Sequence, residues 1–99
     1  MIALAGTVRI LPGMREVALP HIRAMVAASR GEPGCLKYSF AFDVNDDHLV
    51  HIFEVFVDNA ARETHRHSMH MKTWRESWPA AGIGDRDMTE YDIAAARQT

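Results

Sequence analysis

Two segments in which apolar residues alternate with other residues, and a third that is rich in residues that favour strands, constrain most strongly how this chain can fold. In residues 2–11, most of the even-numbered positions hold isoleucine, leucine or valine. Side chains of a strand point alternately to its two faces, so this period of two predicts a strand. The same period recurs over 35–43, the segment 49–57 is rich in residues that favour strands, and the polar run between these two segments predicts a turn. The sequence therefore predicts a first strand followed, further along, by a hairpin.

A helix is predicted between the first strand and the hairpin. After the breaker Pro12-Gly13, apolar residues recur at helical spacing as far as Gly31. Pro20 lies inside this segment and has no backbone N–H for the i→i−4 hydrogen bond. We therefore expect the helix to kink at Pro20 or to begin close to it.

Two residues that favour helix N-termini follow the hairpin. The side chains of Asp58 and Ser68 can each accept a hydrogen bond from an unpaired N–H of a first helical turn. They predict one helix from Asn59 to about His67 and a separate helical piece that runs to Pro79. The second helix is thus expected in two pieces.

The end of the chain predicts a loop over 80–86, which contains two glycines, and a last strand over 87–93. The element order is then β-α-β-β-α-β, the ferredoxin-like α+β arrangement, with an antiparallel sheet and both helices on one of its faces. With 99 residues, we expect a single domain over 1–99, with a core over about 2–93 and a polar tail over 94–99.

The hairpin also predicts self-association. Both faces of the segment 49–57 carry apolar residues, whereas helices on one side of a sheet cover only one face. A chain of this size has a single modest core, and a second copy related by a twofold axis would cover the free face. We therefore expect a homodimer.

Composition excludes several classes of partner. The hydrophobic fraction is 47%, but no apolar run approaches the length of a membrane span, so no membrane is expected. The first residues lack the basic start and long apolar stretch of a signal peptide, and we expect a cytoplasmic location. The net charge is −2 and basic residues are scattered, which argues against nucleic acid as a partner. Cys35 is the only cysteine, so neither an intrachain disulfide nor a cysteine-based zinc site is expected.

Three of the six histidines lie close together in the run 63–74, which suggests acid–base or metal chemistry. His65 and His70 are about 140° apart on an ideal helix, so they share a face only if the helix is interrupted near Ser68. His67 and His70 would face together on a continuous helix, but no third ligand stands at a matching spacing. We therefore expect no metal, and we take His65 and His70 as the catalytic candidates.

Glu54 is the third catalytic candidate, since it stands in mid-strand among apolar residues. An unpaired carboxylate there would be costly or would stay protonated, so Glu54 needs a partner. A neighbouring His65 or His70 would serve, and the pair would combine a base with a group that orients it. The alternative is a structural hydrogen bond that ties helix to strand.

Tyr38, Met69 and Trp74 are the candidates for binding a small-molecule substrate. The two aromatic residues carry a polar tip on an apolar body, which suits a flat and partly polar ligand. Met71 and Trp78 fall at the spacing of an ordinary core-facing stripe and are expected in the core.

The run SRGEPGCLKY at 29–38, Glu54 in its strand, and the pattern His65-x-x-Ser68-x-His70 resemble the signature of the antibiotic biosynthesis monooxygenase family. The resemblance covers residues 2 to about 93. It implies a dimeric α+β barrel with one pocket per subunit, between the sheet and the helices. Within the family, the oxygenases of quinols and polyketide-type aromatics use neither metal nor flavin, so the resemblance implies no cofactor.

The function expected first is a cofactor-independent monooxygenase acting on a small electron-rich aromatic, a quinol or a polyketide-like compound. His65 or His70 would be the base, Glu54 would orient it, and Tyr38 would donate to the developing oxyanion. One alternative keeps the base and removes a proton beside a carbonyl, as an isomerase or degrader of a small carbonyl metabolite. The other is a non-catalytic dimer that binds a small ligand.

Overall fold

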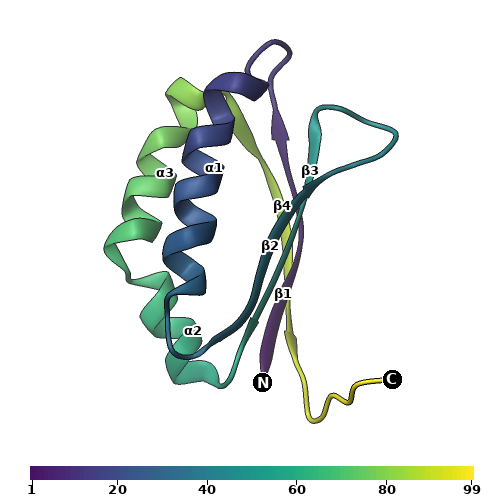
Figure 1. The fold of residues 1–99 in the computed structure, drawn as a ribbon, viewed down its shortest axis with the longest axis vertical. Helices are drawn as coiled ribbons and strands as arrows, with labels where there is room; N and C mark the ends of the chain where they lie inside the picture. Colours follow the sequence, from purple (N-terminus) through teal and green to yellow (C-terminus); the bar gives the residue numbers. More distant parts are fainter.

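The computed structural model describes all 99 residues as one four-stranded antiparallel sheet with three helices on one of its faces (Figure 1). The strands lie in the order β2-β3-β1-β4. In chain order the elements are β1 (Ile2–Ile10), α1 (Arg15–Arg30), β2 (Cys35–Phe42), β3 (Leu49–Phe56), α2 (Asn59–Arg66), α3 (Met69–Ala81) and β4 (Ile83–Asp92). This is the expected ferredoxin-like α+β fold. None of the three helices has the length and apolar character needed to span a membrane.

The division of the second helical segment is confirmed. Asp58 caps α2 by accepting a hydrogen bond from the backbone N–H of Ala61 at 2.8 Å. Ser68 caps α3 in the same way, accepting from Met71 N–H at 3.2 Å. Because the chain leaves helical geometry at His67 and restarts at Ser68, α2 and α3 point different side chains at the sheet than one straight helix would.

The helix does not begin at Pro20, which was one of the two alternatives expected for this residue. Helix α1 begins at Arg15, and Pro20 lies inside it rather than at its start. Ala18, Ile22, Met25 and Ser29 form the buried stripe of this helix at spacings of three and four residues. Packing of that stripe against the sheet therefore outweighs the loss of one backbone hydrogen bond at the proline.

The loop expected over 80–86 is also wrong. Helix α3 continues to Ala81, Gly82 closes it with a φ of 69°, and β4 begins at once at Ile83. A positive φ is the conformation that glycine adopts readily at a helix C-terminus. The glycines that suggested a loop instead make a sharp junction between helix and strand.

A β-bulge explains how β4 can begin so early. Asp85 and Arg86 together stand opposite the single residue Val8, where the register of β1 and β4 shifts between Thr7 and Arg9. Asp85 has a φ of 50°, the only positive value outside glycine. The extra residue shifts the alternation of β4 by one position.

The consequence of the bulge is that Ile83 and Arg86, three residues apart, both face the helices. Ile83 belongs to the core cluster, and Arg86 lines the cavity described below. In a regular strand, residues three apart lie on opposite faces. The bulge therefore places a charged side chain on the inner face of the sheet.

The outer face of the sheet stays open and carries aromatic residues. Phe53 on β3 is 44% exposed and Tyr91 on β4 is 50% exposed. Both pair across the sheet with outward-facing residues of β1, Ala5 and Ala3. The prediction that β3 carries apolar residues on both of its faces is thus confirmed.

Gly6 is expected to be indispensable for the pairing of β1 with β4. A Cβ added there would lie 1.9 Å from the carbonyl oxygen of Asp87 and 2.7 Å from Cα of Met88, both backbone atoms. Gly6→Ala should lower the free energy of unfolding by about 1–3 kcal/mol or more, measured by thermal and urea denaturation. Gly84→Ala on the same strand pair is the control, because a Cβ there meets nothing within 4 Å. Equal effects of the two substitutions would refute this account of the close approach.

Candidate functional site

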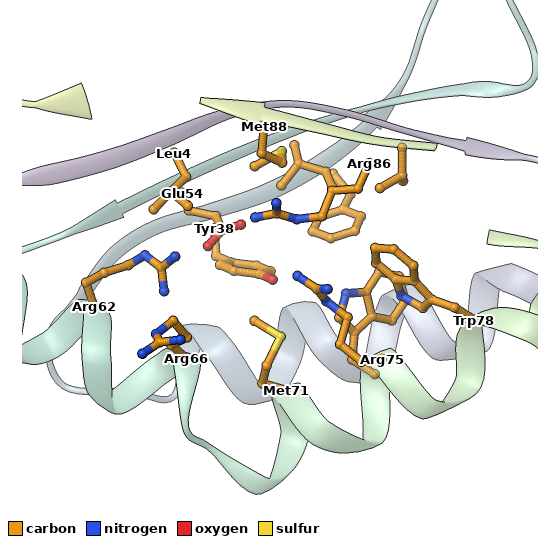
Figure 2. Close-up of a pocket in the computed structure, with 14 residues that line it drawn as sticks. Leu4, Tyr38, Glu54, Arg62, Arg66, Met71, Arg75, Trp78, Arg86 and Met88 are labelled. Carbon is orange, nitrogen blue, oxygen red and sulfur yellow. The ribbon is translucent and has the colours of Figure 1, made fainter. Parts of the chain in front are cut away.

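A cavity of about 320 Å³ lies between the inner face of the sheet and helices α2 and α3 (Figure 2). Its volume falls at the lower end of the range for small-molecule sites. The lining residues come from six of the seven elements: Leu4, Val8, Tyr38, Phe40, Ile52, Glu54, Arg62, Arg66, Met71, Trp74, Arg75, Trp78, Arg86 and Met88. The cavity thus combines an apolar wall with a small number of charged groups.

Aromatic side chains form most of the apolar wall. Tyr38 stacks on Phe40 with ring centroids 5.6 Å apart, Phe40 meets Trp74 edge-on at 5.5 Å, and Trp74 meets Trp78 edge-on at 5.6 Å. Tyr38 is 2% exposed and Trp74 is 5% exposed. Such a continuous run of rings offers a flat ligand a surface for stacking.

Glu54 is the only carboxylate that lines the cavity. Strand β3 presents it on the inner face, beside Tyr38 on β2 and Leu4 on β1. It is 7% exposed, and burial raises the pKa of Glu54 from its usual 4.5 to about 7, although three arginines around the cavity oppose the shift. A carboxyl group with a pKa near 7 can take up or release a proton at neutral pH.

Tyr38, next to Glu54 in the sheet, stays a hydrogen-bond donor. Burial, and after it the charge of Glu54, raise the pKa of Tyr38 above its usual value. The phenol is therefore protonated at neutral pH, as the expected role of Tyr38 requires.

Four arginines line the same cavity: Arg62, Arg66, Arg75 and Arg86. Arg62 is held by Glu90 at 3.1 Å, and Arg66 by Glu63 at 3.1 Å. These two guanidinium groups have carboxylate partners of their own. They belong to the structural charge network at the α2 end of the cavity.

The other two cavity arginines have no such partner. Arg75 on α3 and Arg86 in the β4 bulge take part in no ion pair and no side-chain hydrogen bond within the chain. Arg75 lies 4.8 Å from the ring centre of Trp78, a cation–π distance that holds it along the wall. Burial, and after it the charge of Arg86, lower the pKa of Arg75 from its usual value. These two cations therefore repel each other across a space that holds no counter-charge of their own.

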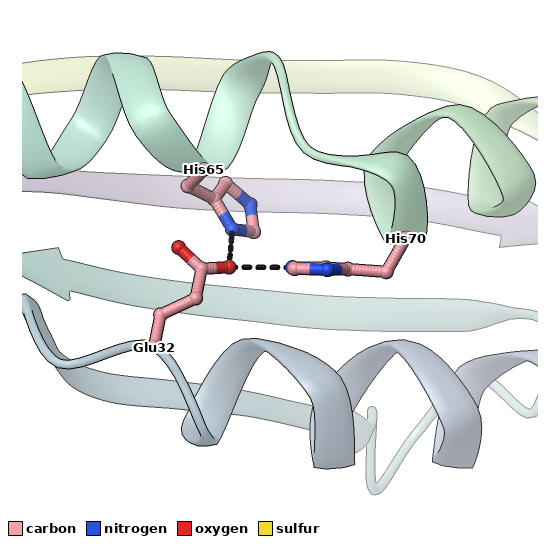
Figure 3. A group of neighbouring side chains, drawn as sticks. All are labelled: Glu32, His65 and His70. Atoms are coloured by element: carbon pink, nitrogen blue, oxygen red, sulfur yellow. Dashed lines mark hydrogen bonds and ion pairs between the residues drawn. The ribbon is translucent and has the colours of Figure 1, made fainter.

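Behind Glu54 lies a second cluster, formed by Glu32, His65 and His70 (Figure 3). Oε2 of Glu32 is 2.8 Å from Nδ1 of His65 and 2.5 Å from Nε2 of His70. Glu32 sits in the connection between α1 and β2, where its backbone N–H donates to Ser29 and its carbonyl accepts from Cys35. One carboxylate oxygen thus joins this connection to both α2 and α3.

His65 links this cluster to the cavity. It is fully buried, and burial lowers its pKa despite the neighbouring Glu32. A neutral His65 that donates from Nδ1 to Glu32 keeps an unprotonated Nε2, which lies 3.6 Å from Oε1 of Glu54 and has no hydrogen-bond partner. Glu54 therefore has a proton acceptor directly behind it.

The structure separates the residues predicted for the site. Glu54, Tyr38 and Trp74 line the cavity together, and His65 touches it only through Glu54. His70 does not line the cavity: its side chain is 27% exposed, in a groove between α1 and α3. The interruption at Ser68 brings the two rings to a centroid distance of 5.8 Å, as expected, but their shared partner is Glu32 and not Glu54.

Met69 is misplaced in the prediction of substrate-binding residues. It is 73% exposed and lies in the groove between α1 and α3, outside the cavity. As the first residue of α3, Met69 lies directly after the capped turn, where the new helix starts with its side chain outward. Met71 and Trp78, expected as plain core, are the residues of this helix that line the cavity beside Trp74.

Sequence reasoning missed Glu32 and the arginines. Glu32 stands in the segment Gly31-Glu32-Pro33-Gly34, whose sequence indicates only the end of the preceding helix. Arg62, Arg66 and Arg75 read as the solvated side of helices, although the spacing of Arg62 and Arg66, four apart, places them on one helix face. Only Arg86 carried no signal at all, since its direction depends on the bulge.

The third donor that was missing for a metal site is also Glu32. Donor atoms of Glu32, His65 and His70 lie within 4.8 Å of one another, close enough to hold a cation. The same atoms already form hydrogen bonds with one another, from the two histidine rings to Glu32. These hydrogen bonds explain why the three side chains lie together.

Fold and site together define a small ferredoxin-like α+β protein with one arginine-lined cavity and a buried carboxylate in it. A family model for antibiotic biosynthesis monooxygenases matches residues 1–77. The chain belongs to this family.

Solved structures share the fold along nearly the full chain. A Deinococcus radiodurans protein assigned to the antibiotic biosynthesis monooxygenases superposes with a TM-score of 0.90 at 20% identity, covering 100% of this chain and 98% of that one. The protein PA3566 of Pseudomonas aeruginosa is 31% identical with a TM-score of 0.83, covering 95% and 94%.

One curated relative is similar in sequence. The uncharacterized protein sll1783 of Synechocystis is 29% identical over 93 residues, which are 94% of this chain and 63% of that protein. The chain thus spans less than two thirds of that relative's length.

Glu32→Ala tests the cluster of Figure 3. The substitution leaves the buried Nδ1–H of His65 without an acceptor, so the free energy of unfolding should fall by about 1–3 kcal/mol, measured by urea denaturation at pH 7. Glu63→Ala is the control, because Glu63 forms only exposed ion pairs, which contribute little. A Glu32 variant as stable as the Glu63 variant would show that the cluster does not support the fold.

Proposed function

We propose that this protein is a monooxygenase that needs no bound cofactor and acts on a small electron-rich aromatic, a quinol or a polyketide-like compound. The observation that carries the proposal is Glu54, a buried carboxyl group with a pKa of about 7 on the wall of a cavity lined with aromatic rings. Family membership supports the reaction class.

Glu54 acts as the base in this proposal, and the roles first expected for Glu54 and His65 are exchanged. The carboxylate of Glu54 faces the cavity, whereas His65 has no exposed surface. Glu54 therefore takes the proton of a substrate hydroxyl group. His65, held by Glu32, orients Glu54 from behind and offers Nε2 as the next proton acceptor.

The substrate anion then reacts with dioxygen, the co-reactant. It transfers an electron to O2, and recombination forms a C–O bond to a ring peroxide. Glu54 returns its proton to the distal oxygen of this peroxide and then takes the ring proton from the carbon that carries it. The C–H electron pair forms a carbonyl as the O–O bond breaks, and the distal oxygen leaves as water with the proton that Glu54 returns. For a quinol, the balance is quinol plus O2 to hydroxyquinone plus water. Tyr38 O–H and the fixed charge of Arg62 stabilise the negative oxygen that develops on the substrate.

The cluster behind Glu54 gives the proton a way to solvent. From Nε2 of His65 the hydrogen-bonded groups lead through Glu32 to His70, which is partly exposed in the groove between α1 and α3. His65 and His70 thus keep a part in the reaction, as positioning and proton-transfer residues rather than as the groups that touch substrate.

The arginines around Glu54 favour a second candidate function. A carboxylate base surrounded by cations also suits proton abstraction beside a carbonyl, because the enolate that forms is an anion. The protein would then be an isomerase or a degrader of a small carbonyl metabolite. A non-catalytic ligand-binding protein is the remaining alternative.

Glu54→Gln tests the base. Oxygen uptake by the wild type with a panel of quinols and hydroxyquinones, followed with an oxygen electrode, should rise with pH around a midpoint near 7, because only the ionised carboxylate accepts a proton. The variant should lose about 100-fold or more in kcat/KM and should lose this pH dependence. Asp43→Asn, at an exposed ion pair far from the cavity lining, is the control.

Stability distinguishes loss of the base from loss of the fold. Because the folded-state pKa of Glu54 is raised from 4.5 to about 7, its ionisation destabilises the native state as pH rises through this window. Glu54→Gln should therefore melt at the same temperature as the wild type, or higher, at pH 8. If the wild type binds the panel and takes up no oxygen, the oxygenase proposal fails. Solvent deuterium entering a carbonyl substrate would then support the second candidate.

We further propose that the protein is a cytoplasmic homodimer, joined through the outer face of the sheet. Phe53 and Tyr91 lie on this face and are about half exposed, and a second copy would cover them. Phe53→Glu should convert a dimer into a monomer in light scattering after gel filtration. Val44→Glu is the matched control, since Val44 is 94% exposed in the β2–β3 turn. A wild-type monomer at micromolar concentration would exclude the dimer.

A further inference from the structure

Two cations in the cavity lack a counter-charge. Each of the other two cavity arginines has a carboxylate partner, and Arg75 and Arg86 have none. The protein as a whole carries a net charge of −2, so its general charge does not explain a local excess of cations. Both side chains are largely open to solvent at the edge of the cavity, so burial is not what makes them notable. Two cations that line one cavity and repel each other, with no carboxylate paired to either, instead create a local positive field that favours an anionic group of a ligand.

Glu54 does not supply that partner. Its proton is needed in the reaction, and with a pKa of about 7 it is only partly ionised at neutral pH. Arg62 is also the cation with the largest effect on Glu54, ahead of Arg86 and Arg75. The two unpaired arginines are therefore available to bind an anionic group other than Glu54.

The local structure is arranged to keep both cations in the cavity. Arg86 faces inward only because of the β4 bulge, which adds a residue opposite Val8. Arg75 is held along the ring of Trp78. Figure 2 shows both side chains reaching from opposite walls, one from β4 and one from α3, toward the same part of the cavity.

We propose that Arg75 and Arg86 bind a carboxylate group of the substrate, so that the substrate is an aromatic acid rather than a neutral quinol. This inference rests on the proposed use of the cavity as the substrate site. Guanidinium groups bind carboxylates through two parallel N–H···O hydrogen bonds, which also fix the orientation of the group.

The position of the carboxylate orients the ring for reaction. With its acid group between Arg75 and Arg86, the ring stacks on the wall formed by Trp74 and Phe40, and a ring hydroxyl group reaches Glu54 beside Tyr38. A carboxylate bound at one end and a base at the other would select among isomers of a substituted aromatic. Neutral ring systems of the same shape would leave two guanidinium groups unpaired.

Binding without turnover tests this inference. Isothermal titration calorimetry at pH 7.5 and low salt would compare 6-hydroxy-2-naphthoate with 6-hydroxy-2-naphthamide, which has the same ring and shape but no charge. The wild type should bind the acid about tenfold or more tighter than the amide, since hydrogen bonds to charged groups contribute on this scale. Arg75→Gln and Arg86→Gln should each reduce this preference, and the double variant should abolish it.

Arg97→Gln is the matched control, because it removes the same charge from the exposed end of the chain and should keep the full preference. Arg86→Lys and Arg75→Lys, which retain the charge, replace the glutamine variants if those melt early. Equal binding of acid and amide by the wild type, no binding of either, or a preference that survives in the double variant would overturn the inference.

The outcome is independent of the oxygenase test. A preference for the acid without oxygen uptake from any substrate would keep the carboxylate site and reject the proposed reaction. Oxygen uptake with neutral quinols and no preference for the acid would do the reverse.

Discussion

The carboxylate of Glu32, shared by two histidine rings, is the interaction on which the arrangement of the site depends. It connects the turn after α1 to both pieces of the second helical segment, and it fixes which nitrogen of His65 carries the proton. Because Nδ1 donates to Glu32, Nε2 is left to face Glu54. One hydrogen-bonded unit thus sets the orientation of the His65 ring, the surroundings of the Glu54 carboxyl group and the way α3 follows α2.

Two opposing effects determine the charge state of Glu54 in the cavity: burial favours the neutral acid, and the nearby arginines favour the carboxylate. Removal from water raises the pKa of Glu54 to about 7, and the surrounding cations prevent it from rising further. Arg75 and Arg86 line the same cavity but are largely open to solvent, and neither forms an ion pair within the chain. With the proposed substrate and reaction, this site would stabilise an anion twice, once as a fixed group on the ligand and once as charge that develops during reaction.

Much of the fold could be predicted from the sequence because its signals are local. The alternation in β1 and β2, and the caps at Asp58 and Ser68, depend on neighbours in the chain. The predictions failed where a distant contact decides the outcome. Pro20 is accommodated in α1 because the helix packs on the sheet, and β4 begins early because β1 tolerates a bulge beside it.

The sequence by itself determined the element order, the break at Ser68 that brings His65 and His70 to one side, and the position of Glu54 in mid-strand among apolar residues. Tertiary structure alone decided that Glu32, more than thirty residues away, is the partner of both histidines. It also decided that Arg86 enters the cavity, because a bulge reverses the alternation that a sequence pattern assumes. Periodicity reports which face a side chain occupies, whereas the partner that it meets there depends on how separate elements pack.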